Sequence, residues 1–188
     1  MKKQRVLFKV LGLMVCFTLV FGLLATASYA KSKGEIDESV NEGIKSFKKH
    51  VKGANEYLKV AKGVLVIPNV TKAAFIVGGQ YGQGALRVGG KTVDYYSLAA
   101  GSVGWQIGAE QSDMIIIFTT AEALQKFRNS EGWEAGADAE VTVVEAGVTA
   151  PVSTLVSQHP ILGFIIDQKG LMAGVSIKGA KFTRIKTD

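Results

Sequence analysis

The sequence predicts an α+β domain in which a long amphipathic helix precedes a mostly antiparallel, strongly curved or barrel-like sheet that carries one further short helix. Two observations favour this class. Apolar residues recur every three or four positions over residues 35–61, and shorter apolar runs separated by glycine-rich stretches follow as far as Ile177. Because helical and strand-like segments do not alternate regularly, a doubly wound parallel sheet is not expected.

The first thirty residues have the three parts of a secretory signal. Residues 1–5 are basic, residues 10–24 are apolar, and Ser28-Tyr29-Ala30 provides the small residues that precede a cleavage site. The apolar run is shorter than the roughly 20 residues that span a bilayer. We therefore expect cleavage after Ala30, with Ala27 as a second site and an uncleaved anchor as the alternative. This predicts a periplasmic or secreted protein with one domain at residues 31–188.

Removal of this segment changes the charge and removes the thiol. Of the 22 basic residues, the four at Lys2, Lys3, Arg5 and Lys9 lie in it, which leaves 18 against 16 acidic residues. The remaining domain is nearly neutral, so the basic character of the full chain does not indicate nucleic-acid binding. Cys16 is the single cysteine, and it lies inside the apolar run. We expect neither a lipid anchor at Cys16 nor a disulfide in the mature chain.

The first expected element of the mature chain is an amphipathic helix over residues 35–61. Its apolar positions fall on one stripe of a helical wheel: Ile36, Val40, Ile44, Phe47, Val51, Ala54, Leu58 and Ala61. Five lysines face the other side: Lys45, Lys48, Lys49, Lys52 and Lys59. Gly43 and Gly53 each destabilise a helix by about 1 kcal/mol relative to alanine. One kinked helix and two shorter helices are therefore both compatible with the pattern.

Strands are expected next. Residues 63–68 form an apolar run that ends at a proline, and residues 73–88 and 94–110 mix strand-forming residues with glycines. Such dense glycines indicate bends or bulges in a curved sheet. Residues 89–91 read as a turn, and residues 114–118 are the most apolar stretch, which predicts a central strand.

The C-terminal half is expected to contain a short helix and a hairpin. Thr119 and Glu122 form a capping-box pattern for a helix that ends near Asn129, with Leu124 and Phe127 facing inward. Residues 130–139 are expected to be a loop carrying Trp133, and residues 141–145 a strand. Residues 151–160 read as a connection. Residues 161–166 and 171–177 then predict a hairpin around a turn at residues 167–170.

The residue patterns do not predict catalysis, a metal site or a cofactor. The glycines of residues 78–84 lack the spacing of a phosphate-binding loop, so they are expected to shape the sheet. His50 and His159 are the two histidines, and neither lies in a ligand motif. No G-x-S-x-G pattern is present. The remaining candidate acid–base groups read as turn and strand-end residues: Asp94, Glu110, Asp113 and Asp167.

The lysine side of the first helix is the feature with a plausible ligand. Each ammonium group can gain about 1 kcal/mol near anionic lipid headgroups. The same pattern also fits the solvated outer face of a helix that packs on a sheet. The two interpretations are compatible, because a helix packed by its apolar stripe still presents its lysines to a surface.

The strand-rich region carries motifs that occur in one family. An A-K-G-x-x-x-x-P pattern occupies residues 61–68, and glycine-spaced strand segments follow at residues 75–84 and 101–110. The match continues through Phe118 to the short helix at residues 124–127. These segments closely resemble the core of the SYLF domain family, and the resemblance covers most of residues 31–188.

The resemblance implies a phospholipid-binding domain without catalytic residues, and eukaryotic members prefer phosphoinositides. The family's membrane-contacting element looks like the basic amphipathic helix before the A-K-G motif. The candidate lipid-binding residues are Lys45, Lys48, Lys49, Lys52, Lys59, Lys62 and Arg87. The expected partner is an anionic phospholipid or membrane surface; the alternative is an envelope scaffold or protein-interaction module without a lipid ligand. Actin, a partner of eukaryotic members, is not expected for an exported protein.

Overall fold

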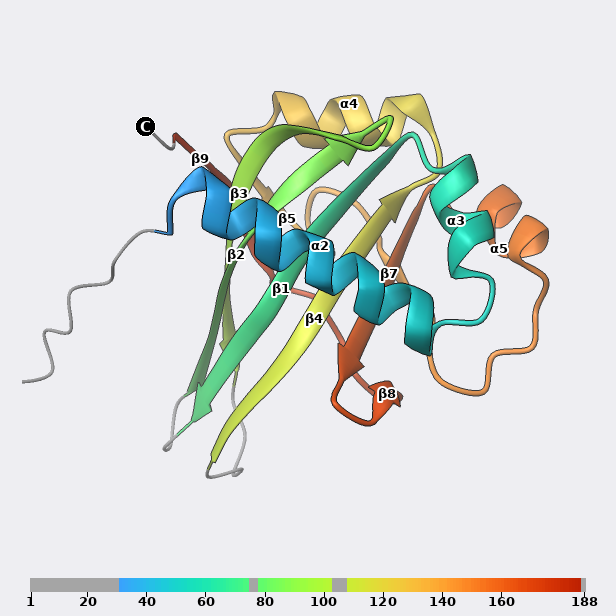
Figure 1. Cartoon of the computed structure of the whole chain (residues 1–188). Coiled ribbons are helices and arrows are strands. Elements are labelled where there is room, and N and C mark those ends of the chain that lie inside the picture. Colours follow the sequence, from blue (N-terminus) through green and yellow to red (C-terminus); the bar gives the residue numbers. More distant parts are fainter. Residues whose placement is uncertain (1–30, 75–77, 103–107, 187–188) are drawn as a thin grey trace, which may run out of the picture. The chain divides into compact units, whose positions relative to one another are not determined.

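The computed structural model describes residues 31–74, 78–102 and 108–186 (Figure 1). Residues Lys31–Asp188 form one compact unit. The expected secretory signal at residues 1–30 lies outside the described residues, as do two pieces of the SYLF-like pattern, residues 75–77 and 103–107. The signal and its cleavage site therefore stay predictions.

The expected α+β class is confirmed by the order of the elements. The helices of the described part are α2 (Lys33–His50), α3 (Ala54–Val60), α4 (Ala121–Asn129) and α5 (Val152–Gln158). The strands are β1 (Gly63–Ala74), β2 (Gly78–Val88), β3 (Lys91–Ser102), β4 (Gly108–Phe118), β5 (Gly132–Glu134), β6 (Thr142–Val143), β7 (Ile161–Asp167), β8 (Gly170–Leu171) and β9 (Lys181–Ile185).

The strands form one curled, half-barrel sheet in the order β5-β9-β3-β2-β1-β4-β7-β6, with β8 paired to β7. All pairs are antiparallel except β6 with β7. The chain runs from β5 at one edge to β6 at the other across residues 135–141. That stretch reaches at most about 28 Å, whereas the edges of a flat eight-stranded sheet would lie about 34 Å apart. The sheet must therefore curl.

Each face of the sheet carries its own hydrophobic core, because side chains alternate along the strands. Val64 and Val66 of β1 point to the side covered by α2, whereas Leu65 and Ile67 point to the opposite side. Figure 1 shows α2 lying across β2, β1 and β4. Phe127 of α4 packs in the core on the other side.

The segment predicted as one kinked helix or two shorter helices forms two helices, α2 and α3. It breaks at residues 51–53, where Gly53 adopts a positive φ of 80° and becomes the N-cap of α3. Gly43 does not break α2. A Cβ atom at Gly43 would lie 2.9 Å from Val66 Cγ1, so this glycine lets the helix approach β1 closely. Helix α2 begins with a capping box between Ser32 and Glu35.

Strand β1 does not end at Pro68, which corrects the sequence-based expectation. The register of the β1–β4 pair shifts between Ile67 and Val70, and Asn69 adopts a φ of +53°. The Asn69 N–H donates to Asp113 Oδ1 at 3.0 Å. Because proline has no N–H for the ladder, this bulge lets the strand continue beyond it.

Three details around α4 and β5 also differ from expectation. The N-cap of α4 is Thr120, whose side chain accepts from the Ala123 N–H, rather than Thr119. The Thr119 hydroxyl instead donates to the His159 carbonyl at 2.8 Å. Trp133 lies in the short strand β5 and is buried, because its indole packs 5.3 Å from the Phe127 ring, measured between centroids.

The C-terminal region contains more regular structure than expected in one place and less in another. The expected connection at residues 151–160 holds helix α5, and strand β9 was not predicted. The expected strand at residues 141–145 has two residues in β6. The expected hairpin forms around the predicted turn, but its second arm is a strand of two residues, Gly170–Leu171. The expected alternation along residues 171–177 is therefore wrong.

Candidate functional site

Helix α2 is held on the sheet by its apolar stripe and by polar contacts at its N-terminal half. Ile36, Val40 and Phe47 have no exposed surface. The side chain of Asp37 accepts from the Thr92 hydroxyl at 2.7 Å and from the Tyr95 hydroxyl at 2.9 Å. Burial, and next the hydrogen bond to Asp37, raise the pKa of Tyr95. These contacts fix which side of α2 faces solvent.

The outward side of α2 is divided by charge. Its first half carries three exposed carboxylates, Glu35, Glu38 and Glu42, and one exposed lysine, Lys33. Its second half and the break that follows carry Lys45, Lys48, Lys49 and Lys52. This distribution complements the helix dipole, which favours anions at the N-terminus and cations at the C-terminus. Four of the five lysines from Lys33 to Lys52 therefore lie at the C-terminal end of the helix or just beyond it.

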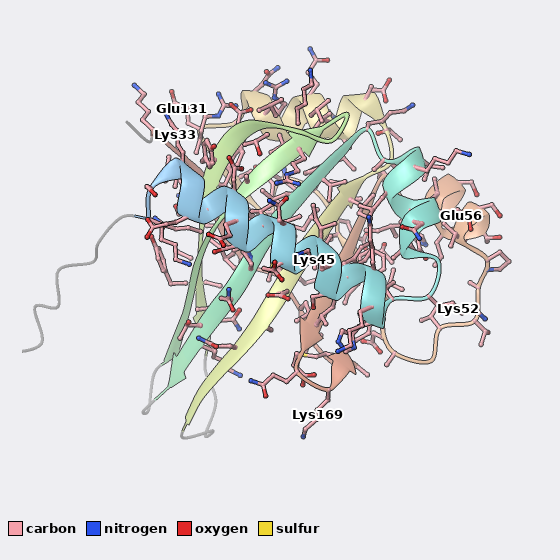
Figure 2. All side chains as sticks on the ribbon, in the orientation of Figure 1. Lys33, Lys45, Lys52, Glu56, Glu131 and Lys169 are labelled. Atoms are coloured by element: carbon pink, nitrogen blue, oxygen red, sulfur yellow. The ribbon has the colours of Figure 1, made fainter. Side chains whose placement is uncertain are left out.

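The four lysines at that end are not equivalent. Lys45 points away from the sheet (Figure 2) and forms an ion pair with Glu42 at 2.7 Å. The hydrogen bond that Lys45 donates to Glu42 raises the pKa of Lys45. Lys48, Lys49 and Lys52 are exposed, and within the described ranges none has a carboxylate at ion-pair distance. We call these three residues the lysine cluster.

A groove of about 900 Å³ lies between the end of α2 and the segment before α5. Its cationic lining comes from Lys49 and Lys52 on one side and from Lys169, in the turn between β7 and β8, on the other, and His50 also lines it. Residues 144–152 form its remaining wall, and Glu56 and Glu145 also line it. We call it the basic groove. It brings together cations that are far apart in the sequence.

The other three candidate lysine and arginine residues lie elsewhere. Lys59 is exposed on α3, and Lys62 is exposed where the chain enters β1. Arg87 is partly buried beneath α2, where its guanidinium donates to Asn41 Oδ1 at 2.8 Å while its buried Nε has no partner. The structure therefore places Lys49 and Lys52 of the lysine cluster in the lining of the groove, and it leaves Lys48, Lys59, Lys62 and Arg87 outside that lining.

Lys169 is the groove residue that the sequence analysis missed. It belongs to the turn of the C-terminal hairpin, where Asp167 Oδ1 accepts from the Lys169 N–H at 2.7 Å and from the Gly170 N–H at 3.0 Å. A single lysine in a polar turn resembles ordinary turn chemistry. Nothing local indicated its proximity to α2.

Asp94, Asp113, Asp167 and His159, which were singled out from the sequence, make structural contacts, whereas His50 lines the basic groove. Asp94 lies 3.0 Å from Arg128 Nε and 3.6 Å from Arg184 Nε, whereas the side chain of Glu110 is outside the described part. His159 Nδ1 lies 2.9 Å from the Thr142 hydroxyl. Within the described ranges, no group of three or more His, Cys, Asp or Glu side chains could hold a metal ion. None of the helices described there is long and apolar enough to cross a membrane.

The chain is similar to one family of known proteins over part of its length. Residues 99–187 match the family described as "Ysc84: Las17-binding protein actin regulator". The chain is 26% identical over 132 residues to "LAS seventeen-binding protein 3" of Saccharomyces cerevisiae, and 28% identical over 130 residues to "Protein YSC84" of the same species. These alignments cover 66% and 65% of the chain and 28% of each yeast protein. The chain thus spans less than a third of the length of these relatives.

Proposed function

We propose that this chain, whose residues 99–187 match the Ysc84, or SYLF, domain family, is a non-enzymatic phospholipid-binding domain that contacts anionic headgroups through the lysine cluster. We propose further that it acts in the cell envelope after export and removal of residues 1–30. The observation that carries the binding proposal is the exposure of Lys48, Lys49 and Lys52, without paired carboxylates in the described part, at one end of a firmly packed helix.

The lysine cluster supplies enough interaction energy for reversible binding. A lysine close to an anionic membrane surface gains about 1 kcal/mol, so the three residues together contribute about 3 kcal/mol, or more than a hundredfold in affinity. Lys45 is expected to add less, because Glu42 already pairs with it. Binding of this kind weakens as salt shortens the Debye length from about 10 Å at 0.1 M to about 3 Å at 1 M.

Co-sedimentation with lipid vesicles tests the proposal. The protein should begin at Lys31, because the apolar residues 10–24 would themselves bind a bilayer of any charge. Residues 31–188 contain both hydrophobic cores, and a thermal melt would verify their folding. We expect binding to vesicles of phosphatidylcholine mixed with phosphatidylserine and little binding to phosphatidylcholine alone.

A charge-matched pair of variants identifies the surface. Reversing the lysine cluster to glutamate should remove binding to the mixed vesicles. Reversing three exposed lysines on other elements, Lys91, Lys126 and Lys178, changes the net charge equally and should preserve most of the binding. Equal binding to neutral and anionic vesicles, or equal losses in the two triple variants, would contradict the proposal.

A protein-interaction module is the second candidate, and the descriptions of the matching family and of one yeast relative favour it. The relative is named for binding to LAS seventeen, and the family description adds regulation of actin. In an exported protein the corresponding partner would be another envelope protein. A single partner that co-purifies in a one-to-one ratio, together with no binding to anionic vesicles, would support this function over lipid binding.

A further inference from the structure

We propose that the membrane is contacted by the basic groove together with the loop at residues 145–151, with Lys169 as a further phosphate-binding cation and Val148 entering the lipid interface. This inference rests on the proposed function and narrows its site. The contact surface would then be the end of α2 and the two segments beside it, rather than the whole outward side of the helix.

The charge of α2 argues against contact along its full length. Glu35, Glu38 and Glu42 are exposed on its first half, so an anionic surface laid along the helix would meet these carboxylates as well as the lysines. At the C-terminal end, the sequence from Lys45 to Lys52 contains lysines and no carboxylate. Figure 2 shows Lys52 and Lys169 both pointing into solvent on the side of the domain where α2 ends. An anionic surface is therefore favoured at that end alone.

Lys169 extends the lysine cluster across the groove. It is exposed, and its backbone is held by Asp167, whose Oδ1 accepts two turn N–H groups. The position of the turn is thus fixed while the ammonium group stays available. Two carboxylates, Glu56 and Glu145, also line the groove, so its three ammonium groups, from Lys49, Lys52 and Lys169, exceed the acidic groups by one, and Lys48 adds a further positive charge next to Lys49 in the chain.

The loop beside the groove supplies apolar surface next to these cations. Residues 146–151 are all exposed and none is charged, and Val148 has 47% of its surface exposed. The loop is held in place, because the Ala146 N–H donates to the Met172 carbonyl and the Val148 N–H donates to the Glu145 carbonyl, both at 3.3 Å. Apolar side chains rimmed by cations are typical of surfaces that enter the headgroup region of an anionic bilayer.

Two single substitutions with matched controls test the inference on residues 31–188. Lys169→Gln should weaken binding to the phosphatidylserine-containing vesicles about fivefold, whereas Lys126→Gln on α4 should leave it unchanged. Val148→Ser should also weaken binding, by roughly fivefold. Val93→Ser on β3, where the valine is 40% exposed, is its control. All four side chains are accessible, so a thermal melt should show intact folding.

Insertion can be measured separately from affinity. A tryptophan introduced as Val148→Trp should shift its fluorescence emission to shorter wavelength when vesicles are added, and Val93→Trp should not. An unshifted Val148→Trp spectrum in a variant that binds vesicles would overturn the insertion of this loop.

The outcomes separate this inference from the proposed function. If Lys169→Gln and Val148→Ser bind as the unsubstituted protein does while reversal of the lysine cluster removes binding, the inference fails and the proposed function stands. If the unsubstituted protein binds no anionic vesicles, both fail. Binding of inorganic phosphate without binding to vesicles would assign the groove to a soluble anion and overturn the membrane contact.

Discussion

Replacement of Gly43 by alanine tests the close packing of α2 on the sheet, which positions the lysine cluster. In the middle of an exposed helix, glycine to alanine stabilises the fold by about 1 kcal/mol. At Gly43 the added Cβ would lie 2.9 Å from Val66 Cγ1 and 3.4 Å from Pro68 Cβ. Because carbon atoms prefer separations of about 3.5 to 4.0 Å, the substitution forces the helix or the strand to move.

The magnitude follows from these opposing effects. Overpacking of a core costs about 1 to 3 kcal/mol, and Val66 cannot easily turn away, because it is fully buried and β-branched. After subtraction of the helix-propensity gain, we expect Gly43→Ala to lower the free energy of unfolding by about 1 kcal/mol. For a domain of this size such a change lowers Tm by roughly 2 to 4 °C.

Gly34→Ala is the matched control, because it makes the same substitution in the same helix. Nothing lies within 4 Å of a Cβ at Gly34, so this variant should keep or raise Tm. Urea and thermal unfolding of both variants provide the measurement, and Val66→Ala should relieve part of the Gly43→Ala defect in the double variant. If Gly43→Ala raised Tm as much as Gly34→Ala does, the proposed close contact between α2 and β1 would be refuted.

Four further outcomes are expected. Gly84→Ala should prevent folding, because the added Cβ would overlap the Val66 carbonyl oxygen. Gly101→Ala should fold normally, because nothing lies within 4 Å of its added Cβ. The yield of soluble protein that melts cooperatively distinguishes the two variants. Phe164→Ala should lower the free energy of unfolding by about 3 to 5 kcal/mol in urea, since its ring packs 5.0 Å from two other aromatic rings. Burial raises the pKa of Tyr96, so the folded protein keeps a proton that the unfolded chain releases; stability should fall as the pH rises through about 10, and less steeply in Tyr96→Phe. Hydrogen exchange of the α2 amides should be as slow with anionic vesicles as without them, and faster exchange on binding would show that the helix detaches.

The elements that local patterns determine could be predicted from the sequence. Residues 114–118 are apolar without interruption, and they form the buried end of the central strand β4. The apolar spacing of α2 likewise survives in the structure as its buried stripe. In both cases the local preference and the tertiary packing agree, so the pattern is sufficient.

Elements that depend on distant partners could not be predicted. Strand β9 has a single buried residue, Phe182, among exposed polar neighbours, and it becomes a strand because it pairs with β3 and β5. Helix α5 has no buried residue and is rich in β-branched and polar residues, which have weak helix propensity. The sequence predicted that β1 would end at Pro68. The strand continues because the Asn69 N–H, in the bulge after Pro68, donates to Asp113 on β4, and this contact between strands is not visible in the local sequence.

The same distinction explains how much of the candidate site was predictable. Lys48 and Lys49 end one helix and Lys52 lies in the break directly after it, so their short separation along the chain places them together. Lys169 and Val148 reach the groove through the sheet order and the crossing of residues 135–141 between its edges. No spacing within the sequence carries that information, since the crossing depends on the curl of the whole sheet.

The packing of α2 also decides how its two sides can be used. An amphipathic helix that lies in a membrane interface buries its apolar side in lipid, but here Ile36, Val40 and Phe47 are fully buried against the sheet. Detachment of α2 into lipid would leave the sheet face beneath it exposed to water, and each buried side chain there, such as Val66 or Phe164, costs about 1.5 to 3 kcal/mol to expose. Three such side chains together cost more than the roughly 3 kcal/mol that the three lysines of the cluster gain at an anionic surface. Detachment of α2 would therefore remove core stability that the lysine contacts do not restore, and the lysines act from a helix that stays on the sheet.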